Sequence, residues 1–181
     1  MLVKDTIMLD ANGTAGYQPS AKLPEGVYVL YFPNQTYLDF LLGADQEFSL
    51  FTSDTDMLIN TIINGSAESE RFLAYQKFIS AKQGDYDKLQ KQVEEHKDDA
   101  ALAASVKQQF EVMNGQVKNY MNQLIQDNPN TFLSRFVLGL QDVEVPDLKI
   151  QFPLLNDTLL QQKRYYNYRN HYIDHISLTD E

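Results

Sequence analysis

The sequence predicts an α+β fold in which an N-terminal antiparallel β-sheet is followed by a helical bundle. Residues 26–51 are rich in β-branched and aromatic side chains, whereas apolar residues recur at helical spacing from residue 72 onward. The change falls at Asn64-Gly65-Ser66, which divides the chain into a strand-rich part, residues 1–64, and a helical part, residues 65–181. Because a sheet needs a covering layer to bury its apolar face, we expect the two parts to form one structural domain.

The composition is that of a folded, acidic protein. The 181 residues are 43% hydrophobic and include 11 Tyr and 10 Phe, which is enough to build a sizeable core. The formal net charge of -10 repels a phosphate backbone, so nucleic acid is not an expected partner. The chain has no cysteine and therefore no disulfide, thiolate metal site or thiol nucleophile. We expect no cofactor.

The strand-rich part consists of short apolar runs separated by turn signals. The alternation along residues 36–42 predicts that Leu38, Phe40 and Leu42 face the core. Residues 59–63 fit either a last strand or a helical turn. The predicted strands are residues 6–9, 14–17, 26–32, 36–42 and 47–51, with turns at residues 10–13 and 33–35.

The helical part begins with a clear N-terminal signal. Ser66 is a good N-cap and is followed by acidic residues, which the helix dipole favours near its N-terminus. Phe72, Tyr75 and Ile79 then share one helix face, and Gly84 is the predicted C-terminal end of this helix.

Apolar positions continue from Leu89 to Leu124 at alternating steps of four and three residues, with one irregular step near Asp98-Asp99. We predict two antiparallel helices with a break there, because one helix over residues 85–126 would be about 63 Å long. That unbroken helix is the alternative. A short buried helix over residues 131–140 follows, then a loop or edge strand at residues 143–153, and a final helix from Asp157 through Tyr168 or beyond.

Two histidines near the end of the chain form a candidate metal site. His171 and His175 are four residues apart, a spacing that places both rings on one face of a helix and is typical of paired zinc ligands. A third ligand could come from Asp174, Asp180 or Glu181. The alternative is that both histidines are surface or packing residues.

The segment 163–169 interleaves basic and aromatic residues, a pattern found in platforms for single-stranded nucleic acid. The net negative charge favours a different interpretation, in which the tyrosines pack on the helices and the basic side chains pair with carboxylates. No nucleophile elbow, phosphate loop, dinucleotide fingerprint or HExxH motif is present. We therefore expect a non-catalytic domain.

A second hypothesis is a ligand-binding module with an aromatic-lined groove between the sheet and the helices. Its candidate lining residues are Tyr28, Tyr31, Tyr37, Tyr75, Tyr165 and Tyr166.

Several stretches taken together resemble a known family. Residues 4–10, 24–31, 37–40 and 45–48 resemble the strand-rich N-terminal region of bacterial cell-envelope thioredoxin-like lipoproteins, which are thiol-disulfide oxidoreductases. Residues 64–66, Phe72 and residues 75–78, 128–131 and 165–174 resemble the helical domain of unknown function that follows it. The strands expected further upstream in that family are missing or reduced here.

The resemblance implies that this chain is part of a longer protein and precedes a thioredoxin-like module whose CxxC pair exchanges disulfides. It implies a periplasmic or cell-envelope location, with contact to the membrane only through a lipid anchor outside these residues. No run of apolar residues is long enough to span a bilayer. The expected function is that of an accessory domain that positions the redox module or recruits client proteins.

Overall fold

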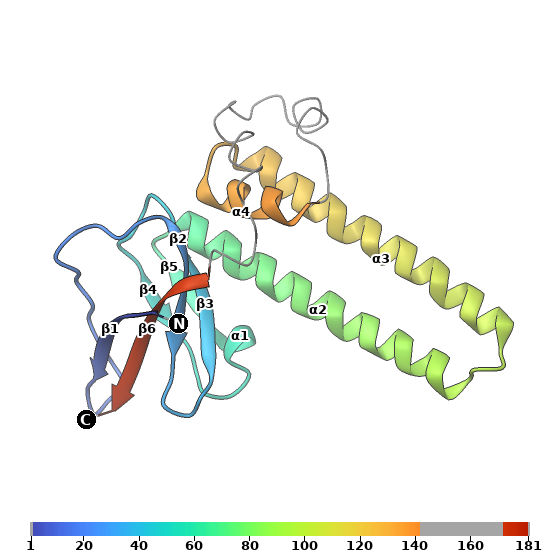
Figure 1. The fold of residues 1–181 in the computed structure, drawn as a ribbon, viewed down its shortest axis with the longest axis horizontal. Helices are drawn as coiled ribbons and strands as arrows, with labels where there is room; N and C mark the ends of the chain where they lie inside the picture. Colours follow the sequence, from blue (N-terminus) through green and yellow to red (C-terminus); the bar gives the residue numbers. More distant parts are fainter. Residues whose placement is uncertain (1, 142–171, 181) are drawn as a thin grey trace.

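The computed structural model describes the backbone of residues 2–141 and 172–180 and the side chains of residues 5–141 (Figure 1). Two sheets at the N-terminal end are followed by helices, so the predicted α+β class is confirmed. The strands are β1 (Leu2–Leu9), β2 (Gly26–Tyr31), β3 (Tyr37–Leu42), β4 (Ser49–Phe51), β5 (Ile62–Asn64) and β6 (Tyr172–Asp180). The helices are α1 (Met57–Asn60), α2 (Ala67–Glu95), α3 (Ala100–Asp127) and α4 (Phe132–Leu140).

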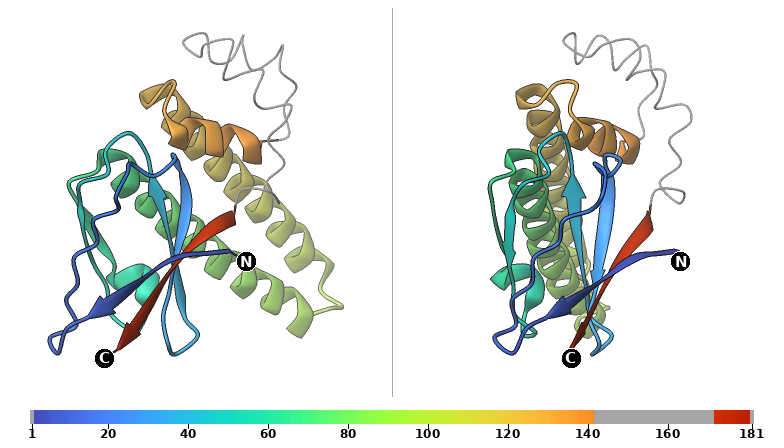
Figure 2. Two further views of the ribbon diagram at one scale, coloured as in Figure 1. Left: turned by 60° about the vertical axis from the view of Figure 1, so that its left-hand side comes forward. Right: turned by 90° about the vertical axis from the view of Figure 1, so that its left-hand side faces the viewer.

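The larger sheet has the strand order β1-β6-β2-β3 and contains a strand that the sequence did not predict. The strands β2 and β3 form the predicted antiparallel hairpin, while β6 lies between β1 and β2 and runs parallel to both (Figure 2). The C-terminal end of the chain therefore completes the N-terminal sheet. The predicted final helix does not extend into residues 172–180; residues 143–153 and 157–168 lie outside the described part of the chain.

The β2–β3 hairpin buries both of its faces. On one face, Leu38, Phe40 and Leu42 are at most 4% exposed, as predicted from the alternation. On the other face, Val27 lies opposite Leu41 in the register, and both belong to the apolar cluster formed with α2, α3 and α4. The sheet therefore lies between helices on one side and the layer containing β4, β5 and α1 on the other.

The predicted strand over residues 14–17 is wrong. The carboxylate of Asp10 accepts hydrogen bonds from the amides of Asn12 and Thr14, at 2.9 and 2.8 Å, and these bonds close the predicted turn and lower the pKa of Asp10. Beyond the turn the chain does not return along β1, which pairs with β6 instead.

Residues 59–63 were predicted to form either a last strand or a helical turn, and the structure contains both. Helix α1 ends at Asn60, and strand β5 begins at Ile62.

A helical hairpin made by α2 and α3 projects from the sheet (Figure 1). Ser66 caps α2 by accepting a hydrogen bond from the amide of Ser69, as predicted, but α2 continues through Gly84 to Glu95. A glycine inside a helix costs only about 1 kcal/mol relative to alanine, which packing against α3 offsets. The predicted break at Asp98-Asp99 is confirmed: Asp99 caps α3 by accepting hydrogen bonds from the amides of Ala101 and Leu102.

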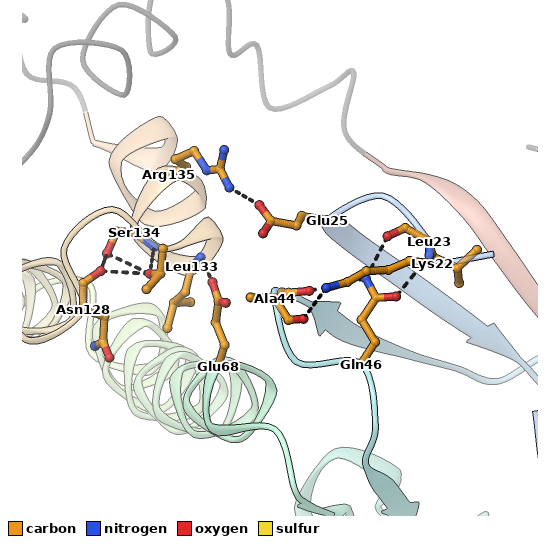
Figure 3. Close-up of polar contacts among 12 residues, drawn as sticks. Lys22, Leu23, Glu25, Ala44, Gln46, Glu68, Asn128, Leu133, Ser134 and Arg135 are labelled. Atoms are coloured by element: carbon orange, nitrogen blue, oxygen red, sulfur yellow. Dashed lines mark hydrogen bonds and ion pairs between the residues drawn. The ribbon is translucent and has the colours of Figure 1, made fainter. Parts of the chain in front are cut away.

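The short helix α4 is confirmed as a buried element, and a carboxylate from α2 holds its N-terminus (Figure 3). Glu68 accepts a hydrogen bond of 2.6 Å from the backbone amide of Leu133, in the first turn of α4. Thr131 accepts from the amide of Ser134 in the same turn. The buried Glu68 carboxylate thus satisfies an amide that has no partner within the helix and interacts favourably with the helix dipole.

Gly43 provides the space that this carboxylate occupies. It directly follows β3 and is buried, and a Cβ atom placed on it would lie 2.6 Å from Cδ of Glu68. Ser69 adds a second link between α2 and the end of β3, since its hydroxyl donates to the carbonyl of Leu41. We call Gly43, Glu68 and Leu133 the junction, because they join β3, α2 and α4.

Candidate functional site

The tyrosines predicted to line a ligand groove do not lie together. Tyr28 is 2% exposed, donates its hydroxyl to the carbonyl of Pro24 at 2.8 Å, and belongs to the cluster on the β4–β5 side of the sheet. Tyr75 is 8% exposed and packs in the other cluster, with its ring against Phe72 and Phe136. The sheet therefore separates these two rings, and both serve as core residues.

The other predicted tyrosines do not complete such a groove within the described residues. Tyr31 and Tyr37 are partners at the end of the β2–β3 hairpin, and Tyr37 is 64% exposed. Tyr165 and Tyr166 lie outside the described residues. Among the four candidate tyrosines that the structure describes, the predicted aromatic groove is therefore not formed.

The helical geometry assumed for the two histidines is wrong. His175 lies in β6, where it pairs with Val3 of β1 and Val29 of β2, so no helix carries both histidines. Asp174 and Asp180 are in the same strand, while His171 and Glu181 lie outside the described residues. His96 is exposed at the C-terminal end of α2. Within residues 5–141, no three His, Asp or Glu side chains gather as a metal site would require.

The surface that the structure offers instead is the outer part of the helical hairpin. We call residues 78–120, which contain the outer halves of α2 and α3 and their connecting loop, the arm. The buried residues of α2 all lie between Glu68 and Tyr75, so the base of the hairpin is anchored and the arm projects beyond the sheet (Figure 1). Stacked rings tie the two helices of the arm together: Phe78 with Tyr120 at 4.2 Å, and Tyr86 with Phe110 at 4.6 Å between centroids.

An open groove of about 540 Å³ runs between the two helices of the arm. Three apolar side chains line it, and the remaining lining residues are amides and charged groups. Lys82 crosses the groove near one end, where its ammonium donates to Oε1 of Gln116 at 2.7 Å. The apolar lining residues are Leu89, Val112 and Met113, and the polar ones are Lys82, Asp85, Lys88, Gln92, Gln108, Gln109 and Gln116.

The chemistry of this groove suits a protein segment. Val112 is 56% exposed, so it presents apolar surface that a partner could cover. Glutamine amides both donate and accept hydrogen bonds, and therefore match the peptide groups of a bound chain without a charge to desolvate. The sequence analysis missed this site. The signal for it was the glutamines on α3 around the Val112-Met113 pair, which place amides beside an apolar position at helical spacing.

Asp39, on the larger sheet, has a shifted acidity. It lies on β3 opposite Val29 and is partly buried. Burial removes water from its carboxylate and raises its pKa above the usual value of 3.8. The charged form is therefore disfavoured in the folded protein, and Asp39 reduces stability when it ionises.

Replacing Asp39 by asparagine is expected to raise the melting temperature at neutral pH. The folded-state pKa lies above the unfolded value, so the folded chain binds more protons between the two pKa values. Asp39 therefore makes its full contribution to stability when the pH is below the pKa of the unfolded state. That contribution is lost as the pH rises through the pKa of the folded state. Melting curves at pH values from about 3 to 7 should show the variant's advantage growing with pH. An advantage that does not change with pH would contradict this assignment.

No family model, curated protein or solved structure matches the chain. Among the described residues, none of the helices has both the length and the hydropathy that crossing a membrane requires. The assignment of a function therefore depends on the residues of the chain and on the geometry of the arm.

Proposed function

We propose that the chain is a non-catalytic accessory domain of a bacterial cell-envelope thioredoxin-like lipoprotein, and that its arm recruits client proteins or positions the redox module. The observation that carries the proposal is the groove along the arm, which is lined by the exposed Val112 together with four glutamine amides. The family resemblance of the sequence supports the cell-envelope context. It also predicts that the complete gene product contains a thioredoxin-like module with a CxxC pair.

The arm has the shape expected of a docking element. The 29 residues of α2 correspond to a helix about 44 Å long, and its outer part stands clear of both sheets (Figure 1). A partner bound there would not have to approach the sheets. The stacked rings and the Lys82–Gln116 bond hold the two helices in register, so little conformational freedom would be lost on binding.

The alternative hypothesis of an aromatic-lined ligand groove has less support. Tyr28 and Tyr75 lie in separate clusters on opposite sides of the sheet, where each completes a core. The groove on the arm is open and seven of its ten lining residues are polar or charged, which fits a macromolecular segment better than a small molecule.

Photo-crosslinking from the arm tests the proposal. A photoreactive amino acid is placed at Val112 in the full-length protein in its native envelope, and at Tyr37 as an equally exposed control outside the arm. We expect crosslinks from position 112 to one defined client or to the thioredoxin-like module, and none to the same protein from position 37. Equal crosslinking from both positions would contradict the proposal.

Variants on one helix then measure the contribution of the groove. Val112→Asp places a charge in the groove and is expected to weaken binding of the crosslinked partner about tenfold, equivalent to about 1.4 kcal/mol. Asn114→Asp adds the same charge to α3 outside the groove and is the matched control. The proposal fails if both variants bind the purified partner as tightly as the wild type does.

A further inference from the structure

The negative charge of the chain is concentrated in one segment. Residues 23–70 contain eight acidic residues and no Lys, Arg or His, which gives this segment a charge of -8 out of the net -10. This segment includes β2, β3 and the whole of β4, α1 and β5. The acidic residues are Glu25, Asp39, Asp45, Glu47, Asp54, Asp56, Glu68 and Glu70.

Three of these carboxylates have partners inside the fold. Glu25 pairs with Arg135, Glu68 accepts from the amide of Leu133, and Glu70 accepts from the amide of Gly65 at 3.0 Å. Four others are exposed and form no ion pair with any residue in the described part of the chain: Asp45, Glu47, Asp54 and Asp56. Glu47 precedes β4, and Asp54 and Asp56 follow it, so acidic residues lie before and after the short strand.

Exposed apolar residues alternate with these acidic residues along the sequence. Phe51 of β4 and Ile62 of β5 are register partners and are 61% and 55% exposed. Ile59 of α1, in the segment that joins the two strands, is 60% exposed. The next register pair, Leu50 and Ile63, packs in the core cluster, so one face of the two-stranded sheet is covered. The other face is exposed and carries the Phe51–Ile62 pair beside the polar pair Ser49–Asn64. We call Phe51, Ile59 and Ile62 the β4–β5 patch.

The backbone beneath the patch is held firmly. Thr61 is fully buried, and its hydroxyl lies 2.7 Å from the carbonyl of Met57 and 2.8 Å from the hydroxyl of Thr52. The ammonium of Lys77 on α2 donates to the carbonyls of Ile59 and Thr61, both at 2.9 Å. The apolar side chains are therefore presented on a preorganised backbone, which reduces the entropy lost on binding.

We propose that the β4–β5 patch is a second docking surface, separate from the arm, for a protein segment whose apolar side chains are flanked by Lys or Arg. Apolar contact would cover Phe51, Ile59 and Ile62, and basic groups would meet the unpaired acids around them. A second copy of this chain is a poor occupant because each copy carries a net charge of -10. An anionic membrane surface is repelled for the same reason.

Binding of defined peptides tests this proposal. The probes are three fluorescent ten-residue peptides, composed of Leu and Lys, of Leu and Glu, and of Ser and Lys, and they are titrated with the intact protein. We expect binding of the Leu–Lys peptide at least tenfold tighter than of the other two. The double variant Phe51→Ser, Ile62→Ser should reduce that affinity at least tenfold. The control Tyr37→Ser, which removes an equally exposed aromatic ring from the larger sheet, should not change it.

Charge variants and the oligomeric state complete the test. Asp54→Asn combined with Asp56→Asn should weaken Leu–Lys binding and flatten its dependence on salt. All variants change exposed residues, so unaltered circular dichroism and melting curves check that they remain folded. The proposal is overturned if the Leu–Glu peptide binds equally well, if the patch variant binds like the wild type, or if sedimentation shows a dimer that the patch variant abolishes.

Discussion

Replacing Gly43 by alanine is expected to lower the free energy of unfolding by about 2–4 kcal/mol. The new Cβ would overlap the carboxyl group of Glu68, with only 2.6 Å to its Cδ. Glu68 would then have to leave the amide of Leu133, or the end of β3 would have to shift. The first outcome leaves a buried amide at the start of α4 without its partner, and the second disturbs the packing of the sheet.

Urea unfolding of single and double variants tests this interpretation of the junction. Glu68→Ala removes the group with which the new methyl collides, so Gly43→Ala should cost less than about 1 kcal/mol in that background. Gly115→Ala is the control, because a Cβ at that exposed helical position meets no atom within 4 Å, and it should stabilise the protein by up to about 1 kcal/mol. Strictly additive effects of the Gly43 and Glu68 substitutions would show that the two residues are not coupled.

Truncating Ile125 to alanine is expected to cost about 2–5 kcal/mol. Ile125 is fully buried on α3, in the cluster that includes Val27 and Leu41 of the sheet, Phe72 of α2 and Leu133 of α4. Removing its side chain leaves a cavity where the helical layer meets the sheet, and rigid neighbours on several elements limit how far that cavity can collapse.

Thermal and urea unfolding of Ile125→Ala measure this effect, with Val112→Ala as the control on the same helix. Val112 is 56% exposed, so its truncation should change stability by less than about 0.5 kcal/mol. If the two variants lose similar stability, Ile125 is not part of the core cluster as described.

Local signals in the sequence predicted much of the fold. The hairpin of β2 and β3 has alternating apolar residues and a turn that fit no other element, and Leu38, Phe40 and Leu42 are buried as expected. The N-cap at Ser66, the break before Asp99 and the helix after Thr131 each depend on side chains that bond to the nearest amides. Such signals act over a few residues, so a single sequence is enough to find them.

The missed features depend on contacts between distant residues. Strand β6 is stable as a strand because it lies between β1 and β2. Both of these strands come more than 140 residues earlier in the chain. Nothing within residues 172–180 specifies that parallel pairing. Gly84 remains helical because α3 packs alongside α2. In both cases tertiary packing overrides the local preference of the residues.

The candidate sites were mispredicted for the same reason, because they depend on how distant parts of the chain come together. The histidine pair was predicted from a helical spacing, but His175 lies in a strand. The tyrosines were grouped by their chemistry alone, whereas the sheet separates Tyr28 from Tyr75. The groove on the arm is lined by residues of two helices, such as Leu89 of α2 and Val112 of α3, so it cannot be recognised before α2 and α3 are placed side by side.

Hydrogen exchange with the partner bound is the most direct test of the claim that the arm is the docking surface. The full-length protein would be compared with and without the purified partner identified by crosslinking from position 112. We expect slower exchange of backbone amides along residues 82–116 and unchanged exchange in β2 and β3. Slower exchange elsewhere in the domain, with none along residues 82–116, would show that the arm is not where the partner binds.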